Sequence, residues 1–338
     1  MIKSVTIKNL RGIREGELSE LTPLVVLVGP NSSGKSTILD ALLIGASPRP
    51  GEAVGNTVSR RPSVHRGARW LLWRSGANGT TTVSVTATGG TTTAGISRTC
   101  MLVLKDQSPG RSTLQLTAVR SDREHLRSPT MDVHVESNNT FSLDGPAVEP
   151  LHAISEVRLI DPQGSGASSP FHELYSRAVE NGRRAEVTSL VAEVVPGVVG
   201  IEILTDEGNP IVHLVFADHS VPAGLAGDGI QSLLRLSLEL ASLRDGVALL
   251  EEPEVHEHPA AIRQSARAIV TAIRRGVQVV LSTHSLEMID ALLAELKDEE
   301  LPLLSLYRLK LTDGVLAKSR LEGPSVLLSR GEIGDDLR

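Results

Sequence analysis

One eight-residue segment constrains the fold of this chain more than any other feature: residues 29–36 read Gly-Pro-Asn-Ser-Ser-Gly-Lys-Ser. The apolar run at 24–28 before it predicts a short buried strand, and we expect a helix from Lys35 to about Leu43 after it. The glycines let the chain wrap so that successive backbone N–H groups point into the loop. A buried strand, a loop of this spacing and a helix together predict the phosphate-binding loop of a P-loop nucleotide-binding protein.

The side chains of this loop have distinct expected parts in holding a triphosphate. Lys35 should reach the β- and γ-phosphates, and the hydroxyl of Ser36 can ligate Mg²⁺. The N-terminus of the following helix adds a favourable field for an anion. We therefore expect ATP with Mg²⁺ as the ligand, in contact with Gly29, Pro30, Asn31, Ser32, Ser33, Gly34, Lys35, Ser36 and Thr37.

Two further apolar runs end in groups that suit phosphoryl chemistry. Residues 246–250 lead into Glu251 and Glu252, and residues 279–282 lead to His284. In an open sheet of parallel strands, ligands bind outside the carboxyl ends of the strands. We expect Glu251 to organise Mg²⁺ and Glu252 to accept a proton from the water that attacks the γ-phosphate. The catalytic candidates are therefore Glu252, His284 and Lys35, and the first metal candidates are Ser36 and Glu251.

The order of predicted elements indicates an α/β fold. After Gly229 the chain alternates between expected helices at 230–243, 260–275 and 285–297 and buried strands at 247–251 and 277–282. Such alternation predicts a mostly parallel core sheet with crossover helices. The Thr- and Val-rich segment 79–145 predicts an added antiparallel region, 170–195 is expected to be helical, and 199–217 reads as a hairpin. We interpret 1–338 as a single ATPase head with an N-terminal lobe (1–160), a helical and hairpin segment (161–225) and a C-terminal lobe (226–338).

Composition narrows the setting of the protein. Cys100 is the single cysteine, which excludes an internal disulfide and favours a reducing compartment. Met1 leads straight into an alternating strand pattern without a charged and apolar leader, and no apolar run is long enough to span a membrane. We therefore expect a cytoplasmic protein.

Charge is divided unevenly between the two halves. Residues 1–150 carry 17 Lys and Arg against 12 Asp and Glu, whereas residues 151–338 carry 17 against 28. Any contact with DNA must then be local, and the best candidate is the arginine-rich segment 49–74. Trp70 and Trp73 lie inside it, and their spacing with neighbouring leucines favours core packing over base stacking.

Several motifs share one family pattern. They are Ile7-Lys8-Asn9-Leu10-Arg11-Gly12-Ile13, Gly29-Pro30-Asn31, Glu251-Glu252-Pro253-Glu254 with His258-Pro259, and Ser282-Thr283-His284-Ser285. Together they resemble the ATP-binding-cassette (ABC) superfamily, specifically the stand-alone ATPase heads of the SMC, RecF and OLD (overcoming lysogenization defect) kind. The resemblance covers most of the chain. It implies that Arg11 is associated with the nucleotide and that His284 senses the γ-phosphate.

The resemblance also implies a second copy of the chain. Residues 227–232 stand where the family has its signature, which closes over the γ-phosphate bound by another protomer, so we expect a homodimer when ATP binds. This segment lacks the Ser-Gly-Gly run of transporter heads, and we expect the amides of Gly227 and Gly229 to make the contact. Gln163 fits the family's glutamine loop by position and is a further metal candidate. Glu251 stands where the wider superfamily has Asp, a change that OLD-like members share.

Alternatives remain for the role of the ATPase. His256 and His258 could suggest a metal site, but the resemblance makes them part of a dimer-facing loop. Only 54 residues follow His284 and they contain no Asp-x-Asp, so we expect any nuclease to be a separate polypeptide. The ATPase could gate a protein effector such as a nuclease in a defence-type system, or bind DNA directly as RecF-like repair proteins do. A transporter subunit is a weaker alternative, given the altered signature.

Overall fold

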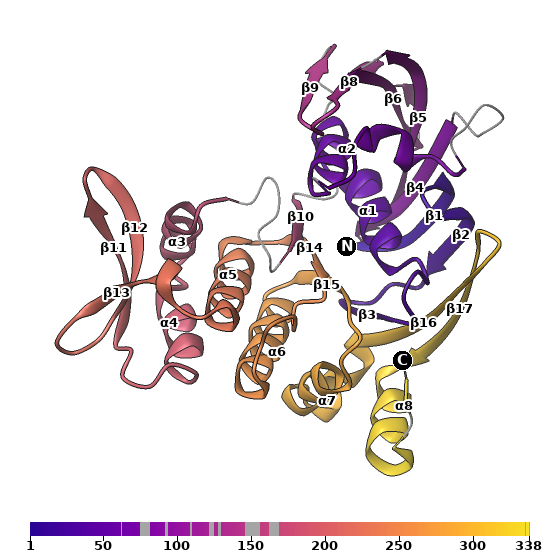
Figure 1. Cartoon of the computed structure of the whole chain (residues 1–338). Coiled ribbons are helices and arrows are strands. Elements are labelled where there is room, and N and C mark those ends of the chain that lie inside the picture. The colour runs from indigo at the N-terminus through magenta and orange to yellow at the C-terminus, as the bar shows by residue number, and fades with distance from the viewer. Residues whose placement is uncertain are drawn as a thin grey trace.

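A single large sheet runs through the molecule (Figure 1), and its order is β10-β14-β15-β3-β16-β17-β2-β1-β4-β5-β6-β8-β9, with β7 beside β6. The structure is a computed structural model that describes residues 1–61, 63–74, 82–91, 94–108, 110–121, 125–127, 130–145, 156–161, 169–334 and 336–337. The first five strands of this order run parallel to one another. They are β10 (Val157–Ile160), β14 (Gly246–Glu251), β15 (Val277–Ser282), β3 (Leu24–Val28) and β16 (Leu304–Thr312).

Strand β3 is wholly apolar, and β14 and β15 are largely so, because helices cover both of their faces. On β3, Leu24, Val26 and Val28 pack into the core formed with α5 (Asp228–Ser242), α6 (Pro259–Arg274) and α7 (Leu286–Glu295). Val25 and Leu27 point the other way, into the core around α1 (Lys35–Ala46). A strand buried on both sides cannot alternate between apolar and polar residues. The predicted parallel core with crossover helices is therefore confirmed.

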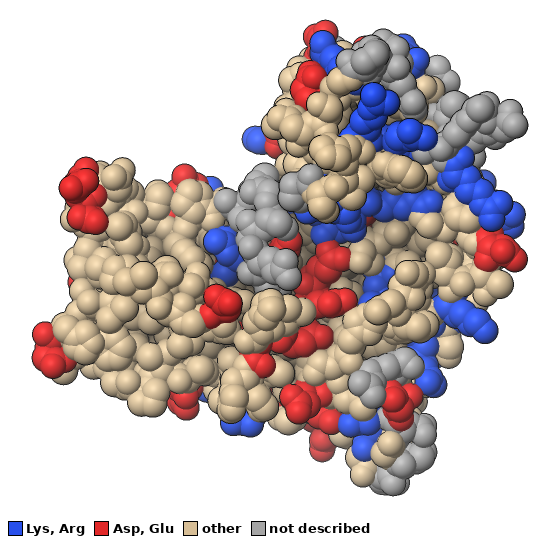
Figure 2. Space-filling view, in the orientation of Figure 1, with Lys and Arg blue, Asp and Glu red and all other residues tan. Residues whose placement is uncertain are grey.

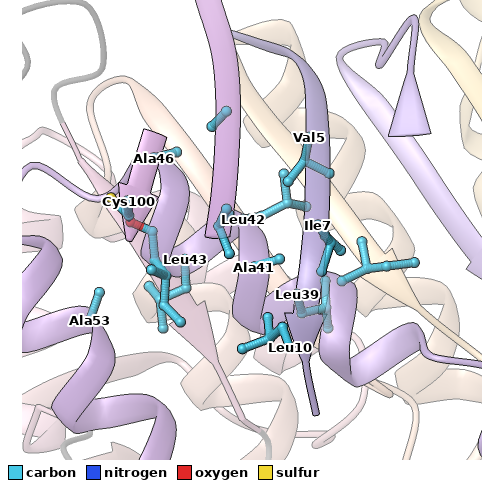
Figure 3. Close-up of a cluster of buried hydrophobic side chains, with 14 of the residues drawn as sticks. Val5, Ile7, Leu10, Leu39, Ala41, Leu42, Leu43, Ala46, Ala53 and Cys100 are labelled. Carbon is cyan, nitrogen blue, oxygen red and sulfur yellow. The ribbon is translucent and has the colours of Figure 1, made fainter. Parts of the chain in front are cut away.

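The remaining strands extend the same sheet with antiparallel neighbours, apart from a short parallel contact between β17 and β2. They are β17 (Val315–Glu322), β2 (Ile13–Ser19), β1 (Ile2–Leu10), β4 (Thr82–Thr91), β5 (Ala94–Ser108), β6 (Arg111–Ser121), β7 (His125–Arg127), β8 (Met131–Glu136) and β9 (Phe141–Asp144). Figure 3 shows how α1 buries its leucines against β1, with Ala53 of α2 (Pro50–Ser59) and Cys100 of β5 nearby. The predicted antiparallel region is confirmed as a continuation of the main sheet.

A smaller unit projects from α5, on the left in Figure 1. It consists of α3 (Phe171–Glu180), α4 (Arg184–Ala192) and a separate antiparallel sheet of β11 (Gly200–Asp206), β12 (Asn209–Val215) and β13 (Ser220–Pro222). The hairpin expected at 199–217 is confirmed as β11 and β12. The helical segment expected at 170–195 is divided in two, because Gly182 adopts a φ of 72° after α3. Glycine enters this left-handed region without steric cost and commonly ends helices.

The other elements are short. They are the 3₁₀ helices Gly67–Leu71, Ala223–Leu225 and Asp298–Leu303, α8 (Gly323–Leu328) and one π-helical turn at Ser329–Ile333. Within the ranges described above, none of the helices combines the length and the apolar character needed to cross a membrane.

Candidate functional site

The loop between β3 and α1 has the backbone geometry that phosphate binding requires. Gly29 and Gly34 have φ values of 145° and 98°, and a Cβ on Gly29 would lie 2.5 Å from the carbonyl oxygen of Leu309. Neither position tolerates a side chain without strain. Gly34 is the N-cap of α1, so the first turn of that helix opens directly onto the loop.

Lys35 is held inside the loop rather than in solvent. Its Nζ donates hydrogen bonds to the carbonyl oxygens of Gly29 (2.8 Å) and Pro30 (3.2 Å). Burial lowers the pKa of Lys35, while the charges of Glu252, Glu251 and Glu254 act in the opposite direction. The ammonium group is thus prepositioned within the loop and faces the acidic end of β14.

A cavity of about 340 Å³ opens over the loop. Its lining consists of Gly12, Asn31, Ser32, Ser33, Gly34, Lys35, Ser36, Thr37, Glu252, His284 and Leu311. The volume lies in the range usual for small-molecule sites. The structure therefore brings together most of the loop with Glu252 and His284, although these segments are more than 200 residues apart in the sequence.

Glu252 and His284 meet because β14 and β15 are parallel neighbours in register, with Glu251 opposite Ser282. Glu252 leaves the strand with a φ of 46°, and its N–H donates to the carbonyl oxygen of Ser282 at 3.0 Å. This turn directs its carboxylate toward His284, whose Nε2 lies 3.4 Å from Glu252 Oε1. A carboxylate and an imidazole facing one cavity can accept and hold a proton there.

Glu254 ties the acidic loop to the histidine loop. Its Oε1 accepts a hydrogen bond from Thr283 Oγ1 at 2.5 Å and another from the N–H of His284 at 3.3 Å. Burial raises the pKa of Glu254. Ser285 then caps α7 by accepting from the N–H of Met288. The backbone of His284 is thus held by Glu254 at its N–H and by the capped start of α7 that follows it.

The side chain of Arg11, which the resemblance associates with the nucleotide, is engaged by groups inside the protein. Its Nε is 2.8 Å from Oδ2 of Asp40, a fully buried side chain of α1, and its NH2 donates to the carbonyl oxygen of Thr57. Burial lowers the pKa of Arg11 to about 10, against the opposing charge of Asp40. The cavity over the loop is lined by Gly12 instead.

Two side chains of the arginine-rich segment 49–74, the best candidate for a local contact with DNA, are engaged inside the protein. Arg60 and Arg61 both form ion pairs with Asp40, and Arg60 also contacts Glu251. The side chain of Arg60 is only 7% exposed. A buried carboxylate needs such partners, since an isolated charge is costly to remove from water. Asp40 was not identified from the sequence as a functional or structural residue. Its position among Leu39, Ala41 and Leu42 indicates a buried acid, which needs a positively charged partner.

The two tryptophans also differ from expectation. Leu71 and Leu72 are buried, but Trp70 is 52% exposed, so its predicted core packing was wrong. The guanidinium of Arg69 lies 5.2 Å from the ring centroid of Trp70. Trp73 is half-buried, because its ring lies against the turn at Gly314. The prediction of core packing is therefore only partly confirmed for Trp73.

The signature segment lies at the start of α5, where Gly227 is the exposed N-cap. A Cβ on Gly227 would meet no atom within 4 Å, whereas a Cβ on Gly229 would lie 2.7 Å from the carbonyl oxygen of His256. Neither glycine lines the cavity of its own chain. His258 accepts a hydrogen bond from the N–H of Ala260 and so caps α6. Gln163 lies outside the described residues.

The oxygen donors suit Mg²⁺. Ser36 supplies a hydroxyl and Glu251 a carboxylate, which are the hard ligands that this ion prefers. In the structure one carboxylate oxygen of Glu251 is engaged by Arg60. On the face shown in Figure 2, acidic side chains gather in the middle of the molecule, below basic ones of its upper part.

Glu257, close to this site, gives a prediction about pH. It accepts a hydrogen bond from Ser265 at 2.8 Å, and burial raises its pKa from 4.5 to about 8. Between these two values the folded chain holds a proton that the unfolded chain has lost. This contribution to stability is complete below pH 4.5 and disappears as the pH rises through about 8.

We therefore expect Glu257→Gln, which cannot ionise, to match the wild type in melting temperature at pH 5 but to exceed it by roughly 2–4 °C at pH 9. Differential scanning calorimetry at both pH values measures this. Glu287→Gln, a change of an exposed acid on α7, is the matched control and should shift the melting temperature equally at both pH values. A pH-independent effect of Glu257→Gln would contradict the assignment.

Comparison with known families and curated proteins supports the ATPase character of the chain. A family model described as "AAA domain, putative AbiEii toxin, Type IV TA system" matches residues 105–290, more than half of the chain, and one described as "AAA ATPase domain" matches residues 1–49. The uncharacterized protein MJECL11 of Methanocaldococcus jannaschii is 32% identical over 114 residues, which cover 33% of this chain and 98% of that protein. MJECL10 of the same organism is 37% identical over 67 residues, covering 20% of this chain but only 31% of that protein.

Solved structures with a similar fold include SMC heads. One is an SMC head bound to the C-terminal winged-helix domain of ScpA, with a TM-score of 0.55, 13% identity and coverage of 95% of this chain and 97% of that one. Another is the SMC head domain with an extended coiled coil, bound to the C-terminal domain of ScpA, from Pyrococcus furiosus, with a TM-score of 0.55, 12% identity and 99% coverage of both chains. At such identities the similarity concerns the fold. The chain therefore belongs to the AAA-type ATPase family described as "AAA domain, putative AbiEii toxin, Type IV TA system", and it has the ABC-type fold of SMC heads.

Proposed function

We propose that the protein binds ATP over the loop at 29–37 and hydrolyses it by attack of water on the γ-phosphate. The observation that carries this proposal is the single cavity shared by Lys35, Glu252 and His284. Lys35 and the loop amides bind the phosphates, Glu252 accepts the proton of the water, and His284 holds the Glu252 side chain in position. Ser36 and Glu251 would hold Mg²⁺, which when bound would supply positive charge beside the phosphates.

We further propose that each chain is one ATPase head, formed by the lobes at 1–160 and 226–338. ATP binding would join two such heads, and hydrolysis would release them. The exposed start of α5 around Gly227 supports this, because it offers backbone N–H groups at a helix N-terminus that its own cavity does not use. The homodimer is the arrangement that completes the site.

The target of the switch is proposed to be a separate effector protein, such as a nuclease, in a defence-type system. The family description, which names a toxin–antitoxin system, supports this direction. Direct DNA binding is a second candidate, favoured by the exposed ring of Trp70 with Arg69 above it. Aromatic rings and arginines together suit single-stranded nucleic acid. A transporter role has no comparable support.

The experiment that separates these roles is ATP turnover by the purified protein. We expect hydrolysis that requires Mg²⁺ and stops when the metal is removed by EDTA. The rate is then measured with duplex DNA, with single-stranded DNA and with proteins that co-purify from the native host. Stimulation by a co-purified protein alone supports the effector role, and stimulation by DNA with loss of the effect in Trp70→Ala supports the second candidate. Absence of hydrolysis in every condition would count against the proposed activity.

A further inference from the structure

Arg60 connects two acids that belong to different parts of the site. It comes just after α2, and its NH2 lies 2.8 Å from Oδ1 of Asp40 on α1, with Nε 3.1 Å from the same oxygen. Its remaining nitrogen, NH1, donates a hydrogen bond to Oε2 of Glu251, at the end of β14. Burial lowers the pKa of Arg60, but the charges of Asp40 and Glu251 outweigh it and hold that pKa above its usual value. The guanidinium is therefore a fixed positive charge at the acidic strand end.

Asp40 alone does not explain this placement. Its carboxylate is also paired with Arg11 at 2.8 Å and with Arg61 at 3.0 Å, so one buried negative charge is shared by three guanidinium groups. Three cations around one anion leave an excess of positive charge, which a second carboxylate offsets. Of the three arginines, Arg60 is the one that forms an ion pair with Glu251 among the described residues.

We propose that Arg60 is a positioning residue that competes with Mg²⁺ for Glu251. This inference rests on the proposed function, in which Glu251 holds the metal. A carboxylate oxygen engaged by a guanidinium is a weaker ligand for a dication, because its charge is already partly neutralised and the two cations repel each other. The side chain of Glu251 is 22% exposed, so solvent only partly screens its charge from Arg60 and from Mg²⁺. In the structure the expected metal ligand is thus engaged by an internal cation.

The surroundings of Arg60 leave space for its NH1 group when that group no longer contacts Glu251. Arg60 also lines a second cavity of about 390 Å³ between α2, β10 and α5. Arg49, Arg158 and Arg177 line this cavity together with acids, and Glu52 and Glu156 are already paired with Arg49 and Arg158. The cavity therefore offers NH1 open space rather than additional negative charge. Since Arg60 keeps its two contacts to Asp40, only NH1 has to change partner. The exchange therefore needs no unfolding of α2.

The test is the Mg²⁺ dependence of nucleotide binding, measured by calorimetry with ADP, which avoids hydrolysis. We compare Arg60→Ala with Arg61→Ala. Both variants remove one guanidinium from Asp40, but Arg61→Ala leaves the contact with Glu251 intact. The Mg²⁺ concentration at which ADP affinity is raised half-maximally should fall about tenfold in Arg60→Ala. This size is consistent with the coupling energies of close charge pairs. It should stay within about twofold of the wild type in Arg61→Ala.

A double-mutant cycle with Glu251→Gln decides whether the effect passes through Glu251. In that background Arg60→Ala should no longer lower the Mg²⁺ requirement. If Arg60→Ala does not fold, Arg60→Lys takes its place and should lower the requirement by a few-fold, since lysine cannot contact Asp40 at two nitrogens while reaching Glu251. An unchanged or increased requirement in the Arg60 variant, an equal effect of Arg61→Ala, or an effect that persists with Glu251→Gln each overturns the inference. Wild-type protein that binds neither ADP nor ATP would refute the proposed function itself.

Discussion

Replacing Lys35 by alanine is expected to abolish ATP binding while leaving the fold intact. The ammonium group lies inside the loop and donates to the carbonyl oxygens of Gly29 and Pro30, positions from which it can turn to the β- and γ-phosphates. Charge-assisted hydrogen bonds to two phosphates are worth several kcal/mol, so affinity should fall at least ~100-fold. Isothermal calorimetry with ATP and Mg²⁺ measures this directly.

The control for Lys35→Ala is Lys8→Ala, which removes an exposed lysine of β1 and should leave ATP affinity unchanged. Near-ultraviolet circular dichroism and thermal unfolding show whether Lys35→Ala keeps its native packing. Its hydrogen bonds are confined to the loop that it serves, and therefore we expect a small change in melting temperature. Wild-type affinity in a folded Lys35→Ala protein would mean that ATP binds elsewhere.

Local sequence patterns were sufficient to predict the framework of this site. The strand at 24–28 is present with the same bounds, and the expected strand at 277–282 coincides with β15. Both are short apolar runs ended by turn-forming or polar residues, so burial and boundary are encoded in the same few residues. The loop and the two acids could be placed for the same reason: each follows directly from the end of a strand.

The parts that could not be predicted depend on packing between distant elements. Nothing near Arg60 in the sequence shows that it contacts Asp40 and Glu251, since that contact requires α2 to pack on α1, which itself packs on β14. A run of arginines is usually solvated, and the interpretation as a DNA-binding surface followed that rule. The prediction for Trp70 was wrong for a related reason. In a 3₁₀ helix, with three residues per turn, successive side chains point about 120° apart, so Leu71 is buried while Trp70 is exposed.

The structure also changes how the composite site should be tested. Arginine at Gly229 is the variant that the sequence suggests, but a side chain there would collide with the carbonyl oxygen of His256 in the same chain. Such a variant would lose function through misfolding and would say nothing about a partner. Gly227 is the informative position, because it has a φ of −61° and open space around its Cβ. An arginine fits there in one chain and obstructs only what approaches from outside.

We therefore expect Glu252→Gln to accumulate as an ATP-bound dimer and Gly227→Arg, added to it, to keep the protein monomeric with ATP still bound. Glutamine preserves the size of Glu252 and its contact with His284 but cannot accept a proton, so turnover should fall by about 10²–10⁴-fold. ATP that is not cleaved remains as the bridge between the loop of one copy and the signature segment of the other. Light scattering with saturating ATP and Mg²⁺ measures the dimer, and calorimetry measures the bound nucleotide.

The matched control is Gly331→Arg in the Glu252→Gln background, which adds the same side chain at another glycine with open space and should leave the dimer unchanged. Comparing the two arginine variants separates obstruction at α5 from a general effect of added charge. Because both start from a protein that retains ATP, loss of the dimer cannot arise from loss of nucleotide. If Glu252→Gln stays monomeric at saturating ATP, or if Gly227→Arg still forms the dimer, two copies do not share one catalytic site. Hydrolysis would then have to be completed by residues of a single chain.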